Sequence, residues 1–313
     1  MGFVQILTNV LSAAVRSGTP LLYATLGEII TERSGVLNLG LEGLMLIGAI
    51  TGFATSFATG NVVLAFILAM VMGAIFSLIH AFMSVTLRVN QVVSGLALTM
   101  LGAGISGMVG KAYIGQVAPR FEEVAIPGLS KIPVIGPAFF HKDVLAYLTY
   151  ILVPLVYYIL FKTKIGLTLR AVGEEPAAAD SRGINVFLVR YIATAVGGAL
   201  TAAGGAYLSL AYTSMWIENM SAGRGWIAIA LVIFSAWEPF KAMLGSYLFG
   251  GVMAVQLRIQ ASGVAAVSAN ILLMLPYIAT VVAMIFFSFS ETFRKRIGAP
   301  SALGIPYSRE EKT

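Results

Sequence analysis

The sequence has no cysteine and little charge. Of its 313 residues, none is Cys and only 11% are Asp, Glu, Lys or Arg. The lack of cysteine excludes a disulfide framework and a thiolate metal site. Soluble proteins carry about 25% charged residues, whereas this chain is 58% hydrophobic with a mean hydropathy of +0.89. These values predict an integral membrane protein.

Motifs of common catalytic sites are also missing. The chain has no Gly-x-x-x-x-Gly-Lys-Ser/Thr phosphate loop, no His-Glu-x-x-His and no plausible Ser/His/Asp arrangement. We therefore expect no catalytic residue, no metal site and no cofactor in this chain. The net charge of +6 does not predict nucleic-acid binding, because most Lys and Arg lie in loops, as the positive-inside rule requires. No removable signal peptide is expected, because no basic region precedes a cleavage site.

Long apolar runs dominate the chain and favour helices over a barrel. They predict an all-α, polytopic transmembrane helical bundle with about eight to ten spanning helices, some broken or re-entrant. Pro20 is expected to divide residues 3–33 into two helices, because proline breaks or kinks a helix. Glu238-Pro239 is expected to divide residues 226–257 into two shorter segments. Further spans are expected at 36–58, 62–87, 90–110, 143–161, 189–212 and 264–289.

Loop charge predicts the orientation of the chain in the membrane. The loop 163–188 and its flanks carry Lys162, Lys164, Arg170, Arg182 and Arg190, and the polar tail 291–313 begins with a basic run. Both segments are therefore expected in the cytoplasm. The tail's basic residues are Arg294, Lys295, Arg296, Arg309 and Lys312. The Pro-rich loop 111–142 then lies outside the cell.

The most informative stretch is a polar island, Val172 to Asn185, between two apolar runs. Pro176 suits the first position of a helix, and the acidic pair before it suits the positive end of the helix dipole. Three alanines follow, which are strong helix formers, and Gly183 suits a left-handed helix end. A helix of about seven residues is unstable alone in water. It is therefore expected to lean on another surface, and a solvated loop is the alternative.

A second stretch, Gly27 to Gly48, combines several glycines with acidic residues inside a largely apolar segment. Such groups are costly in a membrane and face a cavity or a partner, while glycine allows close approach or unwinding. One interpretation is a discontinuous helix beside a polar pathway. The other is a helix end at the interface, with Glu32 and Arg33 in water. The pathway candidates in this stretch are Glu28, Asn38 and Glu42.

Further pathway candidates follow later in the chain. Asn90 and Gln91 open a helix, and Asn90 is a good N-cap, which is favoured over contact with a solute. A polar, aromatic cluster at the outer connection is typical of the membrane interface or of a gate where rings stack on a nucleobase. His80 is expected to be a packed, hydrogen-bonded side chain rather than a proton carrier. The outer cluster consists of Trp216, Glu218, Asn219, Arg224 and Trp226, of which Asn219 is not a pathway candidate.

Three stretches resemble one family of transporters. Gly27 to Gly48, the island from Arg170 to Ile184, and the segments Gly223–Phe234 and Pro239–Gly250 are similar to permease subunits of ABC importers for simple sugars and nucleosides. These belong to a larger group that includes branched-chain amino-acid and ribose permeases. Ribose permeases typically show an Asp-Leu-Ser type motif where this chain has Asn38-Leu-Gly-Leu-Glu42. That difference favours the nucleoside-type branch, whose members work with a binding protein of the basic-membrane-protein type.

The resemblance implies a single transmembrane permease domain over residues 1–290 and a set of partners. In the lipid bilayer of a prokaryotic plasma membrane, the chain would pair with a second, paralogous permease. ABC ATPase subunits would hold ATP-Mg and drive alternating access, and an extracytoplasmic binding protein would deliver the solute. The island would be the coupling loop, through Gly173, Glu174, Glu175, Pro176, Ala177, Ala178, Ala179, Asp180, Arg182 and Gly183.

Two expectations accompany this interpretation. The outer loop 111–142 would meet the binding protein, with Arg120, Lys131 and Lys142 pairing with its acidic lobes; an ordinary re-entry loop is the alternative. The rival function is a secondary transporter driven by an ion gradient. Such a protein would use Glu28, Glu42 or His80 as its coupling site.

Overall fold

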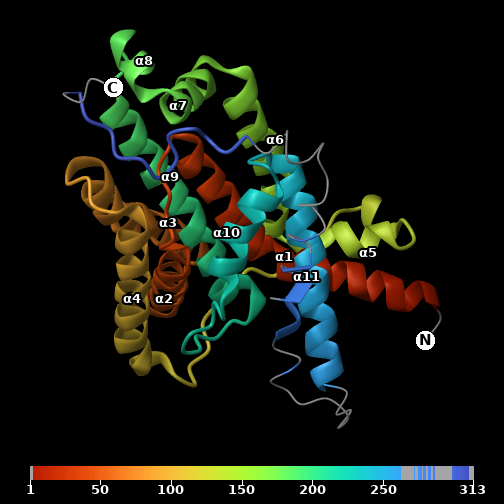
Figure 1. The fold of residues 1–313 in the computed structure, drawn as a ribbon. Helices are drawn as coiled ribbons and strands as arrows, with labels where there is room; N and C mark the ends of the chain where they lie inside the picture. The colour runs from red at the N-terminus through yellow and green to blue at the C-terminus, as the bar shows by residue number, and fades with distance from the viewer. Residues whose placement is uncertain are drawn as a thin grey trace.

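The computed structural model describes residues 3–261, several positions between 271 and 285, and residues 298–309. Most of the span expected at 264–289 lies outside the described residues, as do Arg294, Lys295, Arg296 and Lys312 of the tail. The described part is almost entirely helical (Figure 1).

Six helical stretches in the described part of the chain are long and apolar enough to cross a membrane. The all-α, polytopic prediction is therefore confirmed. The α-helices of the described part, including those too short or too polar to count as spans, are α1 (Phe3–Arg33), α2 (Leu41–Thr59), α3 (Val62–Ala81), α4 (Gln91–Gly110), α5 (Ile135–Phe139), α6 (Val144–Lys162), α7 (Lys164–Glu174), α8 (Pro176–Ser181), α9 (Val186–Tyr207), α10 (Arg224–Phe234) and α11 (Pro239–Ala261). Short π-helical turns, Phe82–Thr86 and Leu208–Tyr212, extend α3 and α9.

The prediction of a break at Pro20 is wrong. Helix α1 runs without interruption through Pro20 for 31 residues. An interior proline costs about 3 kcal/mol, but α1 is buried on both sides of it, with Val15 enclosed before it and Leu21 and Leu22 fully inaccessible after it. Packing therefore outweighs the local preference.

Asn90 accepts hydrogen bonds from two N–H groups at the start of α4, as an N-cap should.

Small residues bring the central helices into close contact. A side chain at Gly48 of α2 would overlap the backbone of Ala202 in α9, and one at Gly73 of α3 would overlap Gly198 of α9. Helices in membranes associate through such small residues, because lipid gives apolar surfaces no reason to leave it. Helix α9 therefore forms the centre on which α1, α2 and α3 pack.

Helices α10 and α11 are separated at Glu238-Pro239, as predicted. Proline occupies the first position of α11, where its missing N–H costs nothing. The expectation of two shorter segments holds for α10, which has 11 residues, but not for α11, which has 23. At 1.5 Å per residue, α10 covers about 16 Å, or about half the hydrocarbon thickness.

The two ends of the bundle carry different structures. Figure 1 shows α7 and α8 at one end beside the C-terminal segment, with the connection after α4 leaving at the other end. That connection contains α5 and a small antiparallel hairpin in which β1 (Glu123–Ala125) pairs with β2 (His141–Asp143). The loop between α4 and α6 thus contains regular structure rather than a plain turn. Its predicted bounds, 111–142, match the interval between α4 and α6.

Candidate functional site

The polar island forms the short helix α8 with the ends that its sequence predicts. Pro176 takes the first position, and Gly183 adopts the left-handed conformation with φ of 81°. The N–H of Ile184 donates to the carbonyl of Ala179 at 3.2 Å, which closes the helix end. Local punctuation therefore determines this element.

Helix α7, which precedes α8, was not anticipated. The hydroxyl of Thr163 accepts a hydrogen bond from the N–H of Gly166 at 3.2 Å and caps its start. A threonine just before a helical pattern is a recognisable start signal. Helices α7 and α8 together make a two-helix platform at the end of the bundle.

The ten residues of the predicted coupling loop divide into an inner and an outer set. Gly173 and Ala179 are buried, and Pro176 and Asp180 are half-buried. The exposed members share the outer surface of the platform. They are Glu174, Glu175, Ala177, Ala178, Arg182 and Gly183. This surface carries small side chains and both signs of charge, and it is available to another protein.

Gly173 joins this platform to the end of α1. A side chain at Gly173 would overlap the Arg33 carbonyl and come within 3.2 Å of the Gly35 nitrogen. Gly35 itself has a φ of +89°, which favours glycine. The two backbones therefore touch directly, and a movement of α7 meets the end of α1 without an intervening side chain.

The loop 34–40 that follows α1 is held by polar groups from two helices, α1 and α4. The N–H of Asn38 donates to a carboxylate oxygen of Glu28 on α1 at 2.9 Å. The N–H of Leu37 donates to the side-chain oxygen of Gln91 at 2.7 Å, and the hydroxyl of Thr99 donates to the Leu39 carbonyl at 3.0 Å. Three pathway candidates, Glu28, Asn38 and Gln91, thus lie around one loop.

His80 belongs to the same cluster. Its ring nitrogens lie 3.0 Å from the Ser94 hydroxyl and 3.1 Å from the Leu37 carbonyl, and the side chain is buried. The expectation of a packed, hydrogen-bonded histidine is confirmed. Sequence reasoning did not connect His80 to the loop after α1, because the contact joins residues far apart in the chain.

Glu42 lies apart from this cluster, against the start of α10. One carboxylate oxygen accepts hydrogen bonds from the Ser221 hydroxyl and the Gly223 N–H, and the other accepts from the Gly225 N–H. The carboxylate is thus placed at the positive end of the half-length helix, where an anion is stabilised. The half-length helix here is α10, which lies outside the stretch Gly27–Gly48, so the discontinuous helix beside a polar pathway stays a prediction.

Glu32 is also enclosed rather than in water. It is 1% exposed and accepts a hydrogen bond from the indole N–H of Trp237, in the break between α10 and α11. The guanidinium of Arg33 lies 3.5 Å from the carbonyls of Ala236 and Trp237. The end of α1 is therefore tied to this break, and the interpretation that left Glu32 in water is wrong.

The outer candidates do not form one open gate. Trp216 is buried against Ile50 and Phe53, whereas Glu218 is exposed and Trp226 is partly exposed. Arg224 is 8% exposed, and its guanidinium lies 5.7 Å from the centre of the Tyr212 ring. The structure therefore separates Trp216 from the surface that a stacked nucleobase would need.

Arg16 is a residue of this outer region that the sequence did not single out. Its guanidinium lies 5.5 Å from the centre of the Tyr212 ring, the ring that Arg224 also faces. It also lies 3.4 Å from Glu123 of the β1–β2 hairpin. Arg16 thus links α1 to the outer loop.

The Lys142 expectation is wrong, because this side chain is not offered to a partner. Lys142 is 3% exposed, and its ammonium group donates to the Ser12 hydroxyl at 2.6 Å. Arg120 and Lys131 are exposed. The hairpin register turns Lys142 inward, which an alternating charge pattern in a Pro-rich loop does not reveal.

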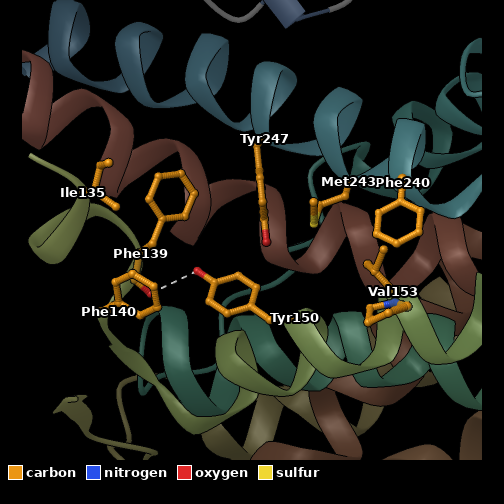
Figure 2. Close-up of a pocket in the computed structure, with 9 residues that line it drawn as sticks. Ile135, Phe139, Phe140, Tyr150, Val153, Phe240, Met243 and Tyr247 are labelled. Carbon is orange, nitrogen blue, oxygen red and sulfur yellow. Dashed lines mark hydrogen bonds between the residues drawn. The ribbon is translucent and has the colours of Figure 1, made fainter. Parts of the chain in front are cut away.

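An apolar pocket of about 290 Å³ lies between α5, α6 and α11. Figure 2 shows its lining, in which the Tyr150 hydroxyl donates to the Phe139 carbonyl at 3.2 Å. No residue of the lining carries a charge: it consists of Ile135, Phe139, Phe140, Tyr150, Val153, Pro154, Phe240, Met243 and Tyr247. The pocket includes none of the residues predicted for coupling or for the pathway.

Comparison with known proteins identifies the family. Residues 10–285 match the model of the branched-chain amino acid transport system permease component. The chain belongs to this family. It is therefore a transporter component and a multi-pass protein of the prokaryotic plasma membrane, and the permease resemblance is confirmed.

Three relatives match over almost their whole length. A putative glucose ABC transporter permease of Haloferax volcanii is 38% identical over 96% of this chain and 98% of its own. A guanosine ABC transporter permease of Bacillus subtilis is 36% identical over 100% of both chains. A nucleoside ABC transporter permease of Lactococcus lactis is 33% identical over 99% of this chain and 100% of its own. No solved structure matches the chain.

These relatives show that the chain is a permease subunit of an ABC importer. Importers of this class work with ATPase and substrate-binding partners. The family assignment therefore favours the ATP-driven function over the rival transporter driven by an ion gradient.

Proposed function

We propose that this permease carries nucleosides, or related simple sugars, and that separate ATPase subunits holding ATP-Mg drive it from the α8 surface. The names of the relatives support the solute class, since two are nucleoside or guanosine permeases and one is a putative glucose permease. A second permease subunit, a paralogue of this chain, completes the pore. An extracytoplasmic binding protein supplies the solute and most of the specificity.

The observation that carries the proposal is the short helix α8, joined through α7 to the end of α1. A helix of six residues is too short to persist alone, because isolated helices need about 12–15 residues. Here α8 is capped at its end and held through buried Ala179, while Ala177 and Ala178 face outward. Small outward side chains allow a groove on an ATPase to close around the helix.

The contacts give a route from this surface to the membrane interior. Closure of the ATPase subunits would displace α8 and α7, and Gly173 would press on the end of α1. The loop 34–40 would move with it and carry along its partners on α3 and α4, His80 and Gln91. Alternating access then follows from a shift of α1 and its loop against α9.

The test uses the permease co-expressed with its native partners and reconstituted in vesicles. Uptake of guanosine and of glucose is measured in parallel, with ATP inside and binding protein outside. Vanadate should stop uptake, and an ionophore that collapses ion gradients should not. The reverse pattern would establish a secondary transporter, and uptake without any ATPase would refute the proposal.

One substitution tests the docking surface itself. Ala178→Glu should abolish co-purification of the ATPase or uncouple ATP hydrolysis from uptake, because a bulky charge fills the surface that the groove must accept. Ala178→Ser is the matched control and should behave as the unaltered protein. Full uptake by the Ala178→Glu variant would count against docking at α8.

A further inference from the structure

The C-terminal segment, residues 298–309, is bonded to both parts of the route from α8 to α1. The N–H of Ala302 donates to the Gly173 carbonyl at 2.9 Å, and the N–H of Gly304 donates to the Gly35 carbonyl at 3.1 Å. The segment therefore lies across the point where α7 and the end of α1 touch. The sequence predicted only a polar tail here.

Side chains of the segment also grip the coupling platform. The hydroxyl of Ser301 donates to a Glu174 carboxylate oxygen at 2.8 Å, and its N–H donates to the same oxygen at 3.1 Å. Arg309 donates to Asp180 of α8 at 3.0 Å. These bonds join both helices, α7 and α8, to the C-terminal segment.

An aromatic residue packs the C-terminal end of this segment against the protein. Tyr307 packs on the buried cluster of Val172, Ala179 and Val186 beneath α8. Its ring lies 5.9 Å from that of Phe187 at the start of α9, measured between ring centres. The C-terminal segment thus forms part of the surface on which α8 rests. The six residues of α8 do not supply this support by themselves.

Arg190 binds the C-terminal segment from the buried side. It is 1% exposed, and its guanidinium donates to the Ser34 carbonyl and to the Ile305 carbonyl, each at 3.2 Å. A cation just beyond the end of α1 also suits the negative pole of that helix. The planar guanidinium reaches two acceptors at once, which a lysine ammonium on its flexible stem does not reproduce.

We propose that residues 298–309 are a clasp that locks α7 and α8 to the end of α1, and that Arg190 and Ser301 are its positioning residues. The inference rests on the proposed function, because it assigns the clasp a part in transmitting force from the ATPase. Without the clasp, α8 still offers its outer face to the ATPase. Gly173 still touches the end of α1, but α7 and α8 are then free to move away from it, so only part of the movement of α8 reaches α1.

The first experiment separates docking from transmission in the reconstituted importer. The variants Ser301→Ala with Arg309→Ala, and Arg190→Lys, should retain the ATPase through purification. Solute moved per ATP hydrolysed should fall about fivefold, at the low end of typical coupling between sites. Ile305→Ala is the matched control, because its side chain is 57% exposed and its carbonyl remains. It should leave the ratio unchanged.

The outcomes distinguish this inference from the proposed function. Variants that bind the ATPase and keep the normal ratio of solute to ATP overturn the clasp alone. If the unaltered protein neither binds nor needs an ATPase, the proposed function fails together with the clasp's role in it. A fall in the ratio with Ile305→Ala as well would show a general effect of the tail and would also overturn the assignment.

A second experiment does not depend on the ATPase. The chain has no native cysteine, so Glu174→Cys with Ser301→Cys provides one defined pair. A short thiol-specific cross-linker should join them in membranes that hold the permease without its ATPase, because the clasp belongs to the permease's own fold. Failure to cross-link there would overturn the proposal.

Discussion

The N–H of Gly225 donates a hydrogen bond to the carboxylate of Glu42 at 2.7 Å, at the point where α10 begins. A side chain at position 225 would overlap the backbone of Glu42, so the two helices meet without a gap. The second carboxylate oxygen accepts the Gly223 N–H, also at 2.7 Å. Glu42 therefore supplies from α2 the acceptors that the first turn of α10 lacks.

This arrangement predicts that Glu42 stabilises the fold more than it binds solute. Glu42→Ala leaves buried donors without acceptors, and each costs about 1–3 kcal/mol. We expect a clear fall in melting temperature in nanodiscs. Glu42→Gln keeps one acceptor oxygen and should fall less. A Glu42→Ala protein with normal melting but weakened solute binding would instead place Glu42 in the pathway.

The elements that the sequence predicted are those set by neighbouring residues. Pro176 and Gly183 mark the ends of α8 through their own backbone preferences, and Asn90 caps α4 through its own side chain. The break at Glu238-Pro239 has the same local origin. Such signals need no knowledge of the fold, and they located α8, although not α7 before it.

The features that the sequence missed depend on contacts between distant segments. Pro20 fails to break α1 because α9 and α11 surround that helix. Ser301 meets Glu174 across 127 positions, and Arg190 meets Ser34 across 156. Arg190 counted in the sequence only as one more basic residue near a membrane end. No periodicity or composition pairs such residues.

Close packing of α2 on α9 gives a second prediction. Gly48→Ala places a methyl group on the backbone of Ala202, and overpacking of this kind typically costs about 1–3 kcal/mol. We expect less folded protein after extraction and a lower melting temperature. Gly104→Ala is the control, since nothing lies within 4 Å of its added methyl group. Equal effects of the two variants would contradict the packing argument.

Charge on the outer loop gives a third prediction. Arg120 and Lys131 are exposed, and the proposed binding protein would meet this loop. Charge reversal of both residues to Glu should weaken stimulation by the binding protein, by up to about fivefold per residue if each pair contributes about 1 kcal/mol. The effect should shrink at high salt. Undiminished stimulation at low salt would remove these two residues from the docking surface.

Lys142 gives a fourth prediction, on the pH dependence of stability. Burial lowers the pKa of Lys142 to about 8, although nearby Glu123 opposes the change. In the unfolded chain the group has its ordinary pKa of 10.5. Between pH 8 and 10.5 the unfolded state therefore binds more protons than the folded state. Stability then rises with pH across this interval.

The comparison of variants isolates this contribution from other groups that titrate in the same range. Unfolding free energy is measured in nanodiscs from pH 7 to 10.5 for the unaltered protein and for Lys142→Met. The difference between the two should change in favour of the unaltered protein above pH 8, because only its lysine sheds a proton in the folded state. Lys131→Met, at an exposed position, should give no such change. Parallel curves for Lys142→Met and the unaltered protein would mean that Lys142 keeps its ordinary pKa and is not buried as the hairpin register requires.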